Sequence, residues 1–483
     1  MDTLKQQTAR GVKWLVGASF IEKTLSLGTT VILARILSPS IFGLFALAFV
    51  AINGLNLFKS MGFDSALIQR KDDIDKAANT AFFIIPLLGC ILFLILYITT
   101  PFIGKFFNNH DVVPVLRALG LIFIINCIGL VPKALLKKEM RFAKVAFSEL
   151  IGALGFSVVA IFLALGGYGV WSLVGGYLFK TLILTCAIWY FSKWRPNWRF
   201  NIKIARQMFH FGKFVFLGSL AFFLRMNLDK IFIGRLLGVA VLGIYALAFN
   251  ISNILVEYFS NKIDQVIFPA YSKKQNDDNA LKRSYLDILK TVSFIALPLT
   301  FCVYLLRTEL VQTIYGHKWI DVIPVIQILI WSGLFRIFTT SAGALFMAKG
   351  KPRYGFWLSS LQVLIFLILI APFSKLFGIK GVAIVVTLAA LIHVFLIMFL
   401  LKRLISMRIT EMFLRIKVPF LATLMMSFVV LLARFLLANI FLTKGTNTSL
   451  LIILLSALAS YIFFMVKFDR QFVMKIKTML IGA

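Results

Sequence analysis

The sequence predicts an all-α membrane protein with about 14 transmembrane helices, arranged as two pseudo-symmetric six-helix lobes followed by two C-terminal helices. The 483-residue chain is 60% hydrophobic and only 14% charged, whereas soluble domains are roughly 45–50% apolar and about 25% charged. Its apolar runs are about 20 residues long and do not alternate with polar residues, as transmembrane helices require and barrel strands do not. A long internal repeat, described below, predicts the two lobes.

The apolar segments follow one another along the whole chain, with short connections between them. Each is long enough to cross a bilayer as a helix, in which every backbone polar group is satisfied internally. We expect transmembrane helices at 13–35, 40–62, 80–104, 115–134, 144–166, 169–191, 211–234, 239–260, 286–306, 322–348, 354–374, 379–401, 416–442 and 448–466.

The formal net charge of +32 is explained by topology. Lys and Arg gather in the even-numbered connections and the two termini, where they outnumber those in the odd-numbered connections by about four to one. Lys59, Lys133 and Lys137 are among those assigned to this role. The bias predicts that both termini are cytoplasmic. Because the basic residues flank apolar segments and form no domain of their own, nucleic-acid binding is not expected.

The cysteines and the loops argue against metal sites and against catalysis. Cys90, Cys127, Cys186 and Cys302 each lie within an apolar run and form no CxxC pair, so we expect small buried side chains and no metal or cofactor. A membrane enzyme such as a polysaccharide polymerase or ligase would need a large outer loop with clustered polar residues. The outer loops are short and the chain has four His, so no enzymatic activity is expected.

An internal repeat divides the chain into related halves. The segment ARILSPSIFGLFALAF recurs 200 positions later as GRLLGVAVLGIYALAF, with Arg35 matching Arg235 and Gly43 matching Gly243. Six spans separate the two copies, so they have the same orientation in the membrane, as in transporters built from parallel repeats. The predicted parts are an N-lobe at 1–195, a C-lobe at 196–404 and a C-terminal helix pair with its tail at 405–483.

Ionisable residues inside the spans are the candidate functional groups, because burying a charge in the membrane is costly. The first spans of the two lobes hold Glu22 and Lys23 in one and Arg225, Asp229 and Lys230 in the other. We predict that these spans face a shared aqueous cavity, in which the cations bind an anionic headgroup and Glu22 or Asp229 carries a coupling ion. The alternative is structural, with Arg225 pairing Asp229 at i, i+4.

Three further charges complete the predicted site. Lys180 and Arg336 are assigned to substrate binding, and Glu149 to ion coupling. Lys180 and Glu149 belong to the same predicted lobe, so the two side chains are also candidates for a structural ion pair.

Two motifs carry a family resemblance. LARILSPSIFGLFALA, and RMNLDKIFIGRLLGVAVLGIYALA in the second half, closely resemble segments of polysaccharide exporters of the multidrug/oligosaccharidyl-lipid/polysaccharide superfamily. The nearest group is the Wzx-type flippases of the colanic acid and teichuronic acid kind. The span count and the lobe layout agree with that group along essentially the whole chain.

The resemblance implies a flippase that moves undecaprenyl-pyrophosphate-linked oligosaccharide units across the bacterial inner membrane for polysaccharide synthesis outside. Transport would use alternating access through a cationic central cavity and a proton or sodium gradient. Membrane lipid, the lipid-linked oligosaccharide and the polysaccharide polymerase machinery would be its partners. The alternative within the superfamily, a cation-coupled drug antiporter, calls for an acidic cavity, whereas the charges in these spans are mixed or basic.

Overall fold

The structure is a computed structural model that describes the backbone of residues 2–59, 62–70, 72–197, 200–439 and 447–481. Side chains are described for most of these residues, with 2–16, 210–219 and 257–266 among the exceptions. Throughout the described ranges the regular secondary structure is helical, which confirms the predicted fold class.

The helices follow the predicted order. Their bounds are α1 Asp2–Ile36, α2 Pro39–Asn56, α3 Phe63–Gln69, α4 Ile74–Phe106, α5 Val112–Lys138, α6 Phe142–Leu165, α7 Val170–Phe191, α8 Ile202–Leu236, α9 Val239–Ser272, α10 Asp278–Leu305, α11 Arg307–Leu310, η1 Val311–Tyr315, η2 His317–Val322, α12 Ile323–Ala348, α13 Arg353–Ile405, α14 Ile409–Asn439 and α15 Asn447–Ile481.

The lengths of these helices agree with about fourteen membrane crossings. Among the described residues, ten helices are long and apolar enough to span a bilayer. One of them, the 53-residue α13, is interrupted at Gly378, where φ is +58°. Because about 20 helical residues suffice to cross a bilayer, α13 corresponds to the two predicted spans on either side of Gly378. The remaining spans correspond to α1, α8 and α9, which are 34 or 35 residues long.

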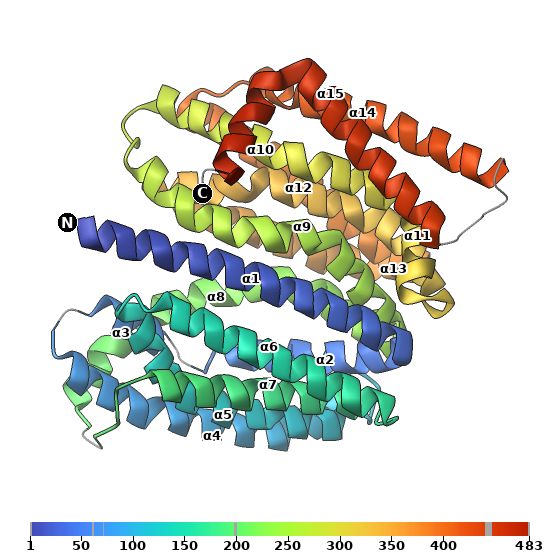
Figure 1. Ribbon diagram of the computed structural model, residues 1–483. Helices are drawn as coiled ribbons and strands as arrows, with labels where there is room; N and C mark the ends of the chain where they lie inside the picture. The colour runs from blue at the N-terminus through green and yellow to red at the C-terminus, as the bar shows by residue number, and fades with distance from the viewer. Residues whose placement is uncertain (1, 60–61, 71, 198–199, 440–446, 482–483) are drawn as a thin grey trace. The chain divides into compact units, whose positions relative to one another are not determined.

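The chain forms two compact units, Met1–Ala246 and Leu247–Ala483. In the first unit, α6 packs against α1 and α7, while α5 packs against α4 and α7 (Figure 1). In the second, α12 packs against α13 and α10, and α14 packs against α10 and α15. These units reflect packing, whereas the lobes at 1–195 and 196–404 were inferred from the repeat, and the lobes stay a prediction.

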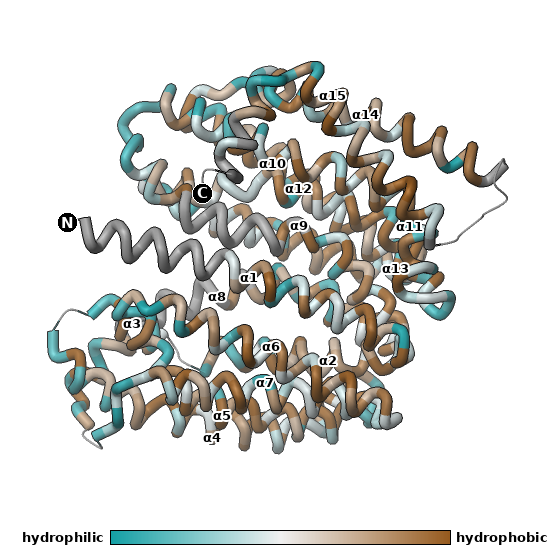
Figure 2. The backbone as a smooth tube through the Cα atoms, in the orientation of Figure 1, coloured by the Kyte–Doolittle hydropathy of each residue, from teal (hydrophilic) through white to brown (hydrophobic). Residues whose placement is uncertain are grey.

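Several helix contacts are made by small side chains, while some large apolar side chains face outward. Ala77, Ala78 and Ala81 of α4 are fully buried, whereas Phe162 and Leu165 of α6 are more than 70% exposed. Figure 2 shows hydrophobic residues along the helices and hydrophilic residues at many helix ends. Close approach through small residues is how helices associate in lipid, since apolar side chains gain nothing there by leaving the surface.

The second predicted span differs from the structure at its end. We expected one helix over 40–62, but α2 ends at Asn56 and the short helix α3 begins at Phe63. Gly62 lies between them with a φ of +80°, a conformation that glycine adopts without the steric cost of a side chain. The chain therefore changes direction here, and α3 packs against α5 and α8.

The two copies of the repeat touch each other. A Cβ atom built on Gly43 would lie 1.8 Å from the carbonyl oxygen of Val239, and one built on Gly243 would lie 1.9 Å from that of Pro39. Pro39 and Val239 are themselves equivalent positions in the repeat. The contact is reciprocal, because Gly43 meets Val239 in the same way as Gly243 meets Pro39. Such an exchange of equivalent positions indicates a two-fold relation between the two copies.

Candidate functional site

Glu22 and Lys180 come together from helices α1 and α7. The Lys180 ammonium lies 3.4 Å from Oε1 of Glu22, and the two side chains are 30% and 28% exposed. Helix α6 packs against both of these helices. The structure thus joins one predicted substrate-binding residue to one predicted coupling residue, and each offsets the other's charge within the first unit.

Glu149 has a different partner from the one the sequence offered. Its carboxylate accepts a hydrogen bond from Lys133 of α5 at 2.8 Å. The suggested pairing of Glu149 with Lys180 was therefore wrong. The reason is the direction of the side chains, since α6 directs Glu149 toward α5 while α7 directs Lys180 toward α1.

Asp229 is buried in the first unit, with 2% of its surface exposed. The Tyr245 hydroxyl donates a 2.6 Å hydrogen bond to one carboxylate oxygen, and the backbone N–H of Lys230 donates to the other at 2.9 Å. Both oxygens thus have partners other than Arg225, unlike in the i, i+4 alternative. The ion-coupling role predicted for Asp229 stays a prediction.

Arg336 lies on α12 in the second unit. Its guanidinium donates a 2.9 Å hydrogen bond to Oδ1 of Asn253 and lies 5.7 Å from the centre of the Phe249 ring. Asn253 is itself buried. A planar guanidinium that stacks on an aromatic face still presents several N–H donors in a fixed geometry. Helix α9 thus orients the Arg336 guanidinium, and the substrate-binding role predicted for it stays a prediction.

Lys23, Arg225 and Lys230 are half-buried. Lys23 lies on α1, which packs chiefly against α6, whereas the other two lie on α8, which packs against α2, α3 and α4. The shared cavity predicted for these residues stays a prediction.

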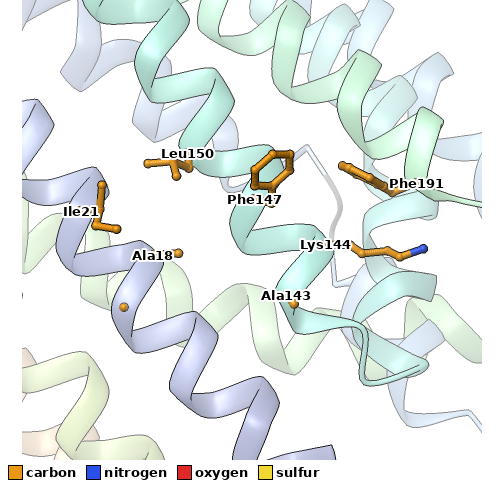
Figure 3. A pocket seen from close by; sticks show the side chains of 8 residues that line it. Ala18, Ile21, Ala143, Lys144, Phe147, Leu150 and Phe191 are labelled. Carbon is orange, nitrogen blue, oxygen red and sulfur yellow. The ribbon is translucent and has the colours of Figure 1, made fainter.

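A large apolar pocket lies between α1 and α6, at the end of α7. Its volume is about 540 Å³. Figure 3 shows Ile21 on one side and Phe147 and Phe191 on the other, with the Lys144 ammonium at the edge. Phe147 and Phe191 meet edge to face at 6.0 Å. We call this the α1/α6 pocket. Its walls can hold a hydrocarbon chain, and Ile21 directly precedes Glu22. The lining residues are Gly17, Ala18, Ile21, Ala143, Lys144, Phe147, Leu150 and Phe191.

A second, polar pocket of about 220 Å³ lies between the end of α2, helix α5 and helix α7. Lys59, Lys133 and Lys137 line it together with Asp64, and we call it the lysine pocket. The sequence assigned these lysines to membrane orientation alone. Nothing in the sequence could reveal the pocket, because Lys59 belongs to one connection and the other two lysines to another. Only the packing of α2 and α3 against α5 brings them together.

Within the described part of the chain, no three His, Cys, Asp or Glu side chains gather closely enough to hold a metal ion.

Comparison with known families decides what kind of protein carries these features. Residues 32–324 match the family described as "Polysaccharide biosynthesis protein". The chain belongs to this family. Among its relatives, the lipopolysaccharide biosynthesis protein WzxC of Escherichia coli (strain K12) is 27% identical over 88% of both chains. The teichuronic acid biosynthesis protein TuaB of Bacillus subtilis (strain 168) is 26% identical over 75% of this chain and 76% of its own.

The fold of this polysaccharide biosynthesis protein is shared with a solved membrane protein. The lipid II flippase MurJ, in an inward closed conformation, superposes with a TM-score of 0.78 over 95% of this chain and 99% of its own, at 18% identity. The match shows that the two chains share one helical fold. With its many apolar helices, the chain is a multi-pass membrane protein.

Proposed function

We propose that this protein is a flippase for undecaprenyl-pyrophosphate-linked oligosaccharide units and that it transports them without changing them chemically. Membership of the polysaccharide biosynthesis family and a fold shared with a lipid flippase support the proposal. We place the protein in a bacterial inner membrane with both termini cytoplasmic, where the flipped units reach the polysaccharide polymerase machinery outside.

The α1/α6 pocket is the observation that best supports a lipid-linked cargo. It is lined almost wholly by apolar side chains, and its 540 Å³ lies within the roughly 300–1,000 Å³ of pockets that bury small ligands. It also lies at the end of α6 that the loop charges place on the cytoplasmic side, where the lipid-linked unit is assembled. A prenyl chain can leave the bilayer sideways into such a pocket, while Lys144 lies where the phosphate would follow.

The charged residues then have separate tasks. We assign the pyrophosphate and acidic sugars to Lys23, Arg225, Lys230, Lys180 and Arg336, which together would make the central cavity cationic. We assign proton or sodium coupling to Glu22, Asp229 and Glu149. In this scheme the Glu22–Lys180 ion pair, which lies within the first unit, opens when Lys180 binds the cargo.

Complementation of an exporter deletion tests this proposal. Lys23→Ala and Arg225→Ala should abolish polysaccharide export while the protein still inserts, because each removes a cation for the headgroup. Ala143→Trp should also block export, because the indole fills the α1/α6 pocket. Val158→Trp is the matched control, since Val158 lies on the same helix and is 67% exposed outside the pocket. Full complementation by all three variants would rule out this assignment.

A further inference from the structure

The lysine pocket brings three lysines together around one cavity. Lys59 follows the end of α2, and Lys133 and Lys137 lie one helical turn apart near the end of α5. Lys133 is paired with Glu149 at 2.8 Å. Among the described side chains, Lys59 and Lys137 have no hydrogen bond or ion pair, and Asp64 is the acidic residue that lines the pocket. These five groups leave a net positive charge.

The surroundings of Lys59 disfavour its charged form. Burial lowers the pKa of Lys59 below its ordinary value, and the nearby Lys133 lowers it further, while Asp64 acts in the opposite direction. A lowered pKa means that the folded protein holds the charged form less well than water does. A bound anion would offset both the burial and the repulsion between lysines.

One wall of the pocket is held in place by hydrogen bonds. Lys138, which follows Lys137, donates hydrogen bonds from its ammonium to the backbone carbonyls of Leu67, Ile68 and Arg70 at the end of α3. This contact fixes α3, which contributes Asp64 and Ile68 to the pocket, against α5. All three lysines near the end of α5 therefore serve this region, one by holding the wall and two by lining the cavity.

We propose that the lysine pocket is a binding site for a phosphate or diphosphate group. Lysine is a common binder of phosphate through its point charge, and the three lysines converge on one cavity from two connections. The volume of about 220 Å³ is below the roughly 300–1,000 Å³ of pockets for drug-sized ligands. It has room for a phosphate or diphosphate group and excludes an oligosaccharide.

This site is separate from the α1/α6 pocket and from the cations proposed for transport. The two pockets share no lining residue, and a buried cluster of Leu136, Val145 and Ile188 borders both. Ile188 lines the lysine pocket, whereas Phe191, which packs against the same cluster, lines the α1/α6 pocket. The inference rests on this cavity and would hold for any cargo.

Thermal unfolding of the purified full-length protein tests the site. We expect inorganic pyrophosphate, at constant ionic strength, to raise the Tm of the unaltered protein by mass action. In Lys59→Gln and Lys137→Gln, the apparent affinity should fall by about tenfold or more, the factor for losing one hydrogen bond to a charged group. Lys59→Gln should also raise the Tm without any anion, because it removes the repulsion. Lys203→Gln, at an exposed lysine of the same unit, should bind like the unaltered protein.

Two lipid environments identify the source of the phosphate. The same variants are compared in nanodiscs of phosphatidylcholine and in nanodiscs that also contain phosphatidylglycerol. A Tm difference between the nanodiscs that disappears in Lys59→Gln and Lys137→Gln assigns the site to a phospholipid headgroup. Stabilisation by pyrophosphate alone assigns it to a free or lipid-linked diphosphate. If neither pyrophosphate nor phosphatidylglycerol stabilises the protein, the site does not exist. The same conclusion follows if Lys203→Gln loses as much affinity for pyrophosphate as the pocket variants. Failure of export in the complementation assay would leave these measurements unaffected.

Discussion

Gly43 and Gly243 are prominent in the sequence, but their role is visible only in the structure. The repeat predicted that the positions are equivalent, because glycine recurs at both with the same neighbours. It could not predict that the two glycines touch, since equivalent positions in a repeat need not meet. The intramembrane charges behaved in the same way. The cost of burying a charge in the membrane was enough to single out Glu22, Lys180 and Glu149. Their partners, however, depended on the direction in which each helix points its side chains.

Gly43→Ala should destabilise the protein strongly. Its new Cβ would lie 1.8 Å from a backbone carbonyl oxygen, which no rotamer change can relieve, so the helices must move apart at a cost of roughly 1–3 kcal/mol or more. Gly28→Ala is the control, because a Cβ there meets nothing within 4 Å and alanine favours a helix by about 1 kcal/mol. Chemical unfolding in detergent measures both. Equal stability of the two variants would show that the repeat copies do not approach so closely.

At the scale of elements, the sequence predicted the long helices well and the short ones poorly. The break between the spans at 354–374 and 379–401 was predictable, and Gly378 adopts a positive φ there. Helix α3 was missed because its seven residues are too few to show an apolar period. It is held by a tertiary contact from Lys138 that no local pattern encodes. The lysine pocket was missed for the same reason, since α3 and α5 build it together.

Lys138→Gln should loosen helix α3. The ammonium bonds the last carbonyls of the helix, which a cation also stabilises through the helix dipole. Its loss should lower the local opening free energy by roughly 1–3 kcal/mol, seen as faster amide hydrogen exchange over 63–69. Arg141→Gln, which removes the surface pair of Arg141 with Glu139 at 3.0 Å, should leave that exchange unchanged. Faster exchange in both variants would mean that Lys138 has no special role.

At the scale of the whole molecule, composition and the repeat predicted an all-helical membrane protein, and the motifs predicted its family. The fold class could be predicted because the bilayer permits so few structures that hydropathy alone selects among them. The orientation, with both termini cytoplasmic, rests on loop charge and stays a prediction. The shared cavity also stays a prediction, because it depends on side chains from helices distant in sequence, which periodicity does not place.

Flipping by the purified protein in vesicles tests the central claim most directly. A fluorescent undecaprenyl-pyrophosphate-linked oligosaccharide is built into one leaflet, and its appearance in the other is followed by a membrane-impermeant quencher with and without a proton or sodium gradient. We expect gradient-dependent flipping that exceeds protein-free vesicles, with the dependence weakened in Glu22→Gln or Asp229→Asn. Flipping no faster than in protein-free vesicles, under either gradient and in both directions, would contradict the account.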